Sequence, residues 1–143
     1  MSPFSPAVVV TGSERTTASP TVKALAKKHG LEIEADQRAH LGIFYRSDHF
    51  SMARAGVPAF SVAPGGKIQG KTPDAVKKAL QEFNDKAYHS PQDEMNPDWD
   101  FSGFVTLAEF ALAVAREVAD TEKLPTWNPG DESLPAREKS GVK

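Results

Sequence analysis

AVVVT, at residues 7–11, is a short β-branched run that ends at Gly12 and is typical of a strand buried on both faces of a sheet. We expect a helix next, because Ser19-Pro20 fits an N-cap followed by a first helical residue, and Gly30 supplies a left-handed stop. Residues Leu31–Ala35 (LEIEA) alternate apolar and acidic side chains, which predicts a second strand with one solvated face. This strand, helix, strand order indicates an α/β protein.

The remaining sequence predicts one more strand and three more helices. We expect a helix from residue 47 or 48 to 55, a strand at Val57–Ala63, a helix from residue 73 or 74 to near 86, and the longest helix from residue 100 or 102 to 120. That last helix has a wide apolar face, and burial of this face is expected to supply much of the folding energy. The face consists of Phe104, Leu107, Ala108, Ala111, Val114, Ala115 and Val118.

These elements amount to three short strands and about four helices, which we assign to a single α/β domain over residues 1–124. Residues 125–143 are rich in proline, glycine and charge. We therefore expect an extended, partly disordered tail that touches the domain at Trp127.

The composition argues against several classes of protein. Lys plus Arg (17) against Asp plus Glu (19) gives a formal charge of −2 with no basic stripe, so we expect no nucleic-acid partner. No stretch approaches the roughly 20 apolar residues of a membrane span, so we expect no membrane partner. The sequence has no cysteine, which excludes disulfides and thiolate sites. Its start lacks a secretory signal, and the compartment stays open, a secreted or periplasmic parent protein included.

A metal site without cysteine must use His, Asp and Glu. Of the four histidines, His29 ends a predicted helix and His40 lies in a polar loop, so both are expected on the surface. His89 differs, because it follows Tyr88 in a proline-rich loop where Asp93-Glu94 could orient its ring. Spacing alone leaves open whether His89 is a metal ligand or an ordinary loop residue.

Two other motifs carry less information. The Asp48-His49 pair fits either a capped helix start or a functional pair. A serine hydrolase is not indicated, because no serine lies between the glycines of a strand-to-helix turn. Pro64-Gly65-Gly66 lacks the Lys and Ser/Thr of a phosphate loop and is interpreted as a connector.

Five stretches in order along the chain form a recognisable combination. They are Val8-Val9-Val10-Thr11-Gly12, Phe44-Tyr45-Arg46-Ser47-Asp48-His49-Phe50-Ser51, Ala55-Gly56-Val57-Pro58-Ala59, Tyr88-His89-Ser90-Pro91 with Asp93-Glu94, and Trp99-Asp100 with Gly103. Together they resemble the C-terminal portion of the metallopeptidase family twenty-eight aminopeptidases, over most of residues 7–130.

The resemblance implies part of an α/β/α sandwich, in which two zinc ions polarise a peptide carbonyl and activate a water. It implies that His89 is the last zinc ligand in chain order and that Tyr88 is catalytic, stabilising the oxyanion. It also implies that Arg46, Asp48 and His49 line the substrate side. The substrate would be a peptide, hydrolysed at its N-terminal bond.

One departure from the family limits what this chain can do alone. The family's other zinc ligands and its general base precede the strand that Ala7–Thr11 resembles, and here only residues 1–6 precede it. A single histidine does not hold two zinc ions against water. We therefore expect zinc to bind weakly or not at all and the chain to be inactive, unless the upstream half of the peptidase is present.

The alternative is a non-catalytic, truncated α/β module that self-associates through exposed strand edges into a homo-oligomer. A third interpretation, a transferase similar to glutaminyl cyclase, fits the Tyr45–His49 run less well. The preferred N-terminal residue and the oligomeric state are not predicted.

Overall fold

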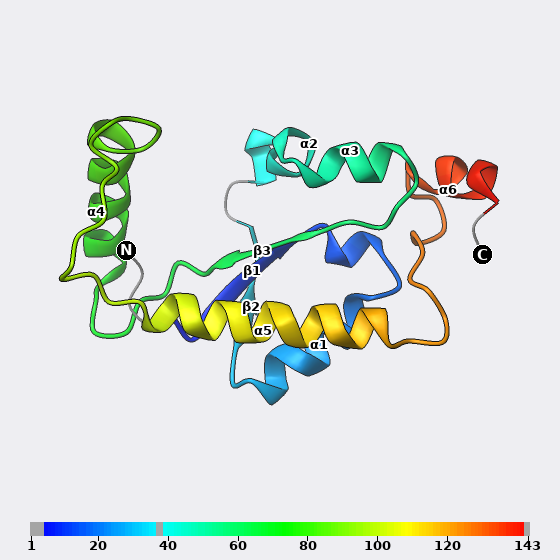
Figure 1. Cartoon of the computed structure of the whole chain (residues 1–143), viewed down its shortest axis with the longest axis horizontal. Helices are drawn as coiled ribbons and strands as arrows, with labels where there is room; N and C mark the ends of the chain where they lie inside the picture. The colour runs from blue at the N-terminus through cyan, green and yellow to red at the C-terminus, as the bar shows by residue number, and fades with distance from the viewer. Residues whose placement is uncertain (1–4, 37–38, 142–143) are drawn as a thin grey trace.

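A computed structural model describes residues 5–36 and 39–141, where three strands form one mixed sheet (Figure 1). The strands are β1 (Ala7–Thr11), β2 (Glu32–Glu34) and β3 (Ser61–Pro64). Strand β1 is central, with β2 parallel on one side and β3 antiparallel on the other. The α/β prediction is confirmed. Residues 1–4, 37–38 and 142–143, which the domain and tail predictions include, lie outside the described residues.

The described ranges contain six α-helices, two more than expected. They are α1 (Ser19–Lys28), α2 (Ile43–Arg46), α3 (His49–Arg54), α4 (Pro73–Lys86), α5 (Ser102–Ala119) and α6 (Leu134–Ser140). Helices α1, α3, α4 and α5 follow the predicted bounds closely. Helix α2 is a single turn, too short to show a period, and begins after Gly42 in the left-handed conformation (φ 64°).

Helix α6 corrects the expectation of an extended tail. A proline lies in its first turn, where the missing N–H costs nothing. The start of this helix was not predicted because the residues around the proline are typical of turns. The contact expected at Trp127 does occur, since that side chain is 1% exposed. The C-terminal segment is therefore folded onto the domain at least as far as α6.

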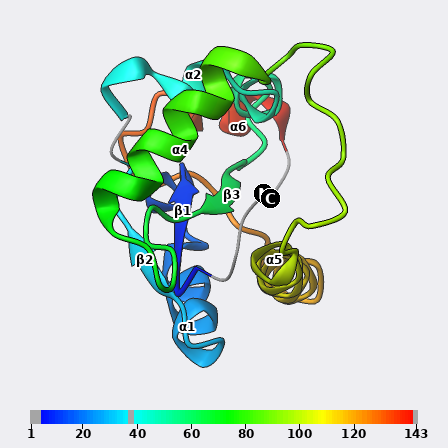
Figure 2. The same cartoon turned by 90° about the vertical axis from the view of Figure 1, so that its left-hand side faces the viewer.

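Helices lie on both sides of the strands, as in part of an α/β/α arrangement. In two perpendicular views α1 and α5 lie on one side and α2, α3 and α6 on the other (Figures 1 and 2). The main core joins β1 to α1 and α5, and its buried members are Val8, Val10, Val22, Ala26, Leu31, Phe110 and Val114. A second, smaller cluster of Phe44, Ala53 and Trp127 joins α2 and α3 to the C-terminal segment.

The apolar face of α5 is buried over a narrower stripe than expected. Phe110 and Val114 are buried, and Leu107 and Val118 pack at their margin. These four residues recur at helical spacing, so one row of side chains faces the sheet. Phe104 was expected in the core, but it is 49% exposed because it lies off this row.

Helix α4 stands at one end of the molecule (Figure 1). Its N-terminus is capped by the Thr72 hydroxyl, which accepts the Ala75 N–H. Val76 is its one buried residue, while Leu80 and Phe83 remain exposed. No helix in the described part of the chain is both long and apolar enough to cross a membrane.

Replacement of Phe110 by alanine should lower the free energy of unfolding by about 3–5 kcal/mol, because it empties the centre of the main core. Leu112→Ala on the same helix is the matched control, since Leu112 is 51% exposed, and should cost less than about 1 kcal/mol. Urea unfolding followed by circular dichroism measures both. Equal losses in the two variants would contradict this description of the core.

Candidate functional site

Tyr88 and His89 lie in the turn that follows α4. Their rings stack with centroids 3.8 Å apart and planes 20° from parallel, and both side chains are exposed. His89 has a φ of 56°, which makes it the one non-glycine residue with positive φ in the described ranges. That conformation is uncommon for a residue with a side chain and occurs mostly where the surroundings hold it in place.

The turn is held from both sides. The Tyr88 N–H donates to the Phe83 carbonyl at 2.9 Å, which extends the last turn of α4. The Ser90 hydroxyl donates to the Ala87 carbonyl at 2.7 Å, and the Ser90 carbonyl accepts the Asp93 N–H at 3.0 Å. These bonds fix the backbone on either side of His89, so the imidazole is presented outward from an ordered turn.

Arg46, Asp48 and His49 lie where α2 meets α3. Arg46 and Asp48 are exposed, and Asp48 occupies the N-cap position of α3 without a side-chain capping bond. His49 is half-buried, with its ring edge-to-face against Phe44 at 4.9 Å between centroids. The Ser47 hydroxyl closes the junction by donating to the Ile43 carbonyl at 2.7 Å.

The two parts of the predicted site are not joined directly. Across residues 5–36 and 39–141, no hydrogen bond, ion pair or ring contact links Tyr88 or His89 to Arg46, Asp48 or His49. The carboxylates Asp93-Glu94, which were expected to orient the His89 ring, make no hydrogen bond to it within those residues either.

A complete metal site is not formed by the described residues. Among them no three His, Asp or Glu side chains gather as a cation would require. A catalytic zinc ion normally takes three protein ligands, so one exposed imidazole does not fit the group by itself. Zinc binding at this turn needs donors that the described residues do not supply.

His49 carries an unsatisfied group. Its Nε2 atom is buried and has no hydrogen-bond partner among the described residues. Burial lowers the pKa of His49, and the neighbouring Asp48 carboxylate opposes that shift. The imidazole is consequently biased toward its neutral form, in which one ring nitrogen can accept a hydrogen bond.

A pocket of about 540 Å³ opens beside this junction. Strands β1 and β2 contribute Val10, Thr11 and Ile33, the one-turn 3-10 helix Ser13–Arg15 contributes its side chains, and Ile43, Phe44 and Tyr45 close the far wall. The lining also includes the carboxylates Glu14, Glu34 and Asp36 and the cations Arg15 and Lys23. The pocket was not predicted from the sequence, although Thr11 ends β1 and Asp36 follows β2, at the carboxyl ends of two parallel strands, where α/β sheets place ligands.

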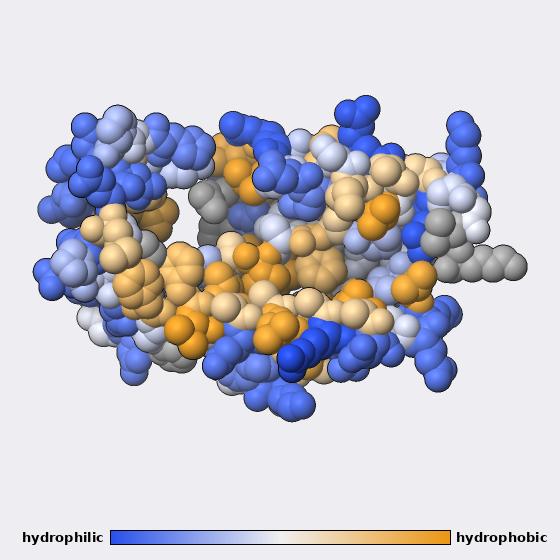
Figure 3. All heavy atoms as spheres, in the orientation of Figure 1, coloured by the Kyte–Doolittle hydropathy of each residue, from blue (hydrophilic) through white to orange (hydrophobic). Residues whose placement is uncertain are grey.

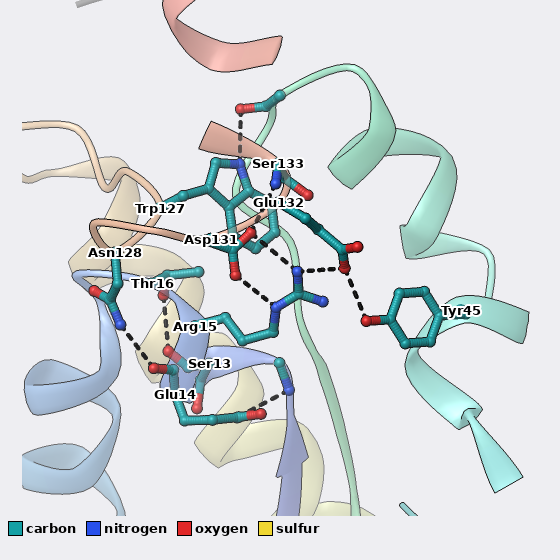
Figure 4. A network of polar contacts seen from close by, with 12 residues as sticks. Ser13, Glu14, Arg15, Thr16, Tyr45, Trp127, Asn128, Asp131, Glu132 and Ser133 are labelled. Atoms are coloured by element: carbon teal, nitrogen blue, oxygen red, sulfur yellow. Dashed lines mark hydrogen bonds and ion pairs between the residues drawn. The ribbon is translucent and has the colours of Figure 1, made fainter. Parts of the chain in front are cut away.

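A polar network borders the pocket and was not predicted (Figure 4). Arg15 donates from Nε and Nη2 to the two Asp131 oxygens at 2.7 and 2.9 Å, and from Nη2 to Glu132 Oε1 at 2.8 Å. Glu132 Oε1 also accepts the Tyr45 hydroxyl at 2.8 Å. The guanidinium lies 4.2 Å from the centre of the Phe44 ring, within cation–π range.

The network shifts the pKa values of its members as this geometry requires. The hydrogen bond to Asp131 raises the pKa of Arg15. Burial raises the pKa of Asp131, but hydrogen bonds from Arg15 and Ser133 together bring that pKa below its usual value. The hydrogen bond to Glu132 raises the pKa of Tyr45. All three groups therefore hold the charge states that the network needs at neutral pH.

The amino-acid sequence matches a known protein family across the candidate site. The sequence model of Peptidase family M28 matches residues 2–115, a span that includes both the α2–α3 junction and the Tyr88-His89 turn. No curated protein and no solved structure matched. The match covers more than half of the chain. The matched family is a family of metallopeptidases, which are hydrolases. The chain belongs to peptidase family M28, which confirms the resemblance seen in the sequence.

The lowered pKa of His49 predicts a pH-dependent stability. In the unfolded chain the imidazole gains a proton near its ordinary pKa of about 6.5, while the folded chain binds that proton only at lower pH. The contribution of His49 is therefore complete above about pH 6.5 and is lost as the pH falls through the folded pKa. The free energy of unfolding, measured with urea at several pH values, should therefore differ less between the wild type and His49→Gln as the pH falls. A difference that stays constant between pH 7.5 and 5 would count against burial of this ring.

Proposed function

We propose that this chain forms the C-terminal part of a zinc-dependent aminopeptidase, which hydrolyses the N-terminal bond of a peptide. The observation that carries the proposal is the family match across the turn that presents Tyr88 and His89 at the surface. His89 contributes one zinc ligand, and the remaining ligands and the general base come from the upstream half of the peptidase. When bound, zinc would polarise the scissile carbonyl and activate a water.

Tyr88 acts on the substrate in this proposal. Its hydroxyl donates a hydrogen bond to the oxygen that becomes negative as the peptide carbonyl is attacked. The ring is stacked on His89, so it is placed beside the residue that binds the metal. Because Tyr88 is 54% exposed, it has room to turn toward a substrate.

The pocket beside the α2–α3 junction is the proposed site for the first residue of the peptide. Its apolar wall of Val10, Ile33 and Phe44 suits a hydrophobic side chain, and the carboxylates at its margin complement a free α-amino group. Arg46, Asp48 and His49 follow directly on the chain from this wall. We propose that they bind the substrate.

Zinc titration and peptidase assays on this chain, and on a form that includes the upstream half, test the proposal. The extended form should bind zinc and release the chromophore from an aminoacyl substrate, while this chain alone should do neither. His89→Ala in the extended form should weaken zinc binding by more than about 100-fold, since loss of a residue that merely orients a ligand already costs 10–100-fold. Activity should fall with it.

Two further variants separate the roles of the turn. Tyr88→Phe should keep zinc affinity and lower kcat by about 10²–10³, the usual effect of removing one oxyanion donor. His40→Ala is the control and should change neither quantity. An extended His89→Ala form with normal zinc affinity and activity would refute the metal assignment.

A non-catalytic, self-associating module is the second candidate, and the exposed surface favours it. A monomer of 15.5 kDa should expose about 7,200 Å², whereas this chain exposes 9876 Å². Even if the eight residues outside the described ranges were as exposed as an unfolded chain, which is about 1,300 Å², an excess of about 1,400 Å² would remain. A stable interface needs about 800 Å² from each partner.

The excess surface is apolar along α5 (Figure 3). Phe104, Val105 and Leu112 are each about half exposed on that helix. In the described sheet β2 and β3 are the outer strands, so each has an edge open to pairing with a further strand. A second copy of the chain would cover both features in this candidate.

Sedimentation equilibrium over about a 100-fold range of concentration tests self-association. If the module associates through this surface, the wild type should shift from monomer to dimer, and a Val105→Glu, Leu112→Glu double variant should stay monomeric. Lys78→Glu, on the exposed part of α4, is the control for added negative charge. A wild type that is monomeric throughout would exclude this candidate.

A further inference from the structure

The C-terminal segment holds the α2–α3 region at both of its ends. At the start of that region, the Tyr45 hydroxyl donates to Glu132 Oε1 at 2.8 Å. At its end, Trp127 Nε1 donates to the Gly56 carbonyl at 3.0 Å. Arg46, Asp48 and His49 all lie between these two anchor points.

Gly56 allows the backbones to pack closely at the second anchor point. It has a φ of 86°, and a Cβ atom built there would lie 2.5 Å from the Arg137 nitrogen in α6. The backbone of α6 therefore packs directly on the turn that ends α3. No other residue fits this position without displacing α6.

Arg15 ties the anchors to the sheet. It follows β1 by a few residues, and its guanidinium pairs with both Asp131 and Glu132 while lying over the Phe44 ring. The segment after Trp127 is held to the same turn, because the Asn128 N–H donates to the Arg15 carbonyl at 2.8 Å. Three distant parts of the chain thus meet at one side chain (Figure 4).

These contacts are separate from the main core. Phe44, Ala53 and Trp127 form their own cluster, whereas the residues of α1 and α5 pack together elsewhere. We call the contacts of Arg15, Trp127, Asp131 and Glu132 with the α2–α3 region the clamp. Trp127, Asp131 and Glu132 lie beyond the part of the chain that matches the family. The clamp therefore acts on the α2–α3 region in particular rather than on the fold as a whole.

We propose that Arg15, Trp127, Asp131 and Glu132 are positioning residues that fix the α2–α3 region and so set the placement of the substrate-side residues between its ends. The role in peptide binding rests on the proposed function. The mechanical role does not, because it is a property of the contacts themselves. Trp127, Asp131 and Glu132 are not among the residues that line the pocket, whereas Arg15 is, so the test variants leave Arg15 in place.

Amide hydrogen exchange and the NMR titration of His49, on the whole chain, test the mechanical role. Tyr45→Phe removes the hydroxyl that binds Glu132 and should speed exchange by roughly threefold to tenfold at Phe50 and Ser51, whose N–H groups donate to the Ser47 and Asp48 carbonyls. Glu132→Ala should act at least as strongly, while Glu132→Gln, which keeps an acceptor for Tyr45, should restore part of the protection. In these variants the His49 ring should gain water while Asp48 stays beside it. The His49 pKa should therefore rise toward its ordinary value.

Lys67→Met is the matched control, because it removes the exposed Lys67–Glu32 ion pair of 2.6 Å on β2, away from the clamp. It should leave exchange at Phe50 and Ser51 unchanged. Trp127→Phe removes the bond to Gly56 and provides a second test, but it also removes part of a buried ring that lies near the Arg15 guanidinium, so Tyr45→Phe is the safer variant for folding. If Tyr45→Phe and Glu132→Ala leave both exchange at Phe50 and Ser51 and the His49 pKa at wild-type values, the proposal is overturned.

Kinetics in the extended peptidase test the effect on substrate. Glu132→Ala should raise KM several-fold and leave kcat within about twofold, because Glu132 does not line the pocket and the Tyr88-His89 turn is untouched. A fall in kcat with unchanged KM would contradict a role in placing substrate-side residues. If the extended wild type cleaves no peptide, the proposed function fails, while the exchange measurements still decide whether the clamp exists.

Discussion

Pairing of the central strand β1 is the constraint on which the other elements depend, because among the described strands β1 alone pairs on both sides, and its buried side chains form part of the main core. Val8 and Val10 pack against α1 and α5, and the β1 backbone sets the register of β2 and β3. The strand ends at Gly12, whose φ of 98° turns the chain sharply into the segment that bears Arg15. A Cβ atom at Gly12 would lie 2.6 Å from the Phe44 ring, so glycine also lets the second cluster approach the sheet. One short strand thereby places both the core and the polar network.

The two clusters have different physical characters. The main core is aliphatic with one phenylalanine, and its stability comes from burial along α1, β1 and α5. The second cluster is mainly aromatic and is bordered by charge-assisted hydrogen bonds that Arg15 donates and that Glu132 accepts. Hydrogen bonds of this kind depend on direction, so they define positions more sharply than apolar contact does. It is the second cluster that borders the pocket and the substrate-side residues of the proposal.

The sequence predicted the strands and the longer helices well, because β-branched runs, caps and helical periods are local signals. It also placed Tyr88 and His89 in a loop, from the prolines around them. Helices α2 and α6 were missed, since one or two turns show no period, and Phe110 was missed because the sequence does not reveal which row of α5 meets the sheet. The pairing of Arg15 with Asp131 joins residues 116 positions apart, and no local pattern encodes it. The roles of Arg46, Asp48, His49, Tyr88 and His89 remain predictions that follow from the family.

We propose that this chain supplies one imidazole, His89, to a metal centre that the described residues do not complete. Zinc-edge anomalous diffraction from crystals of the extended peptidase is the decisive experiment. We expect a zinc ion about 2.0–2.1 Å from a nitrogen of His89, with its other protein ligands from upstream of Ala7. A zinc centre with a full set of protein ligands and His89 remote from it would refute the metal assignment.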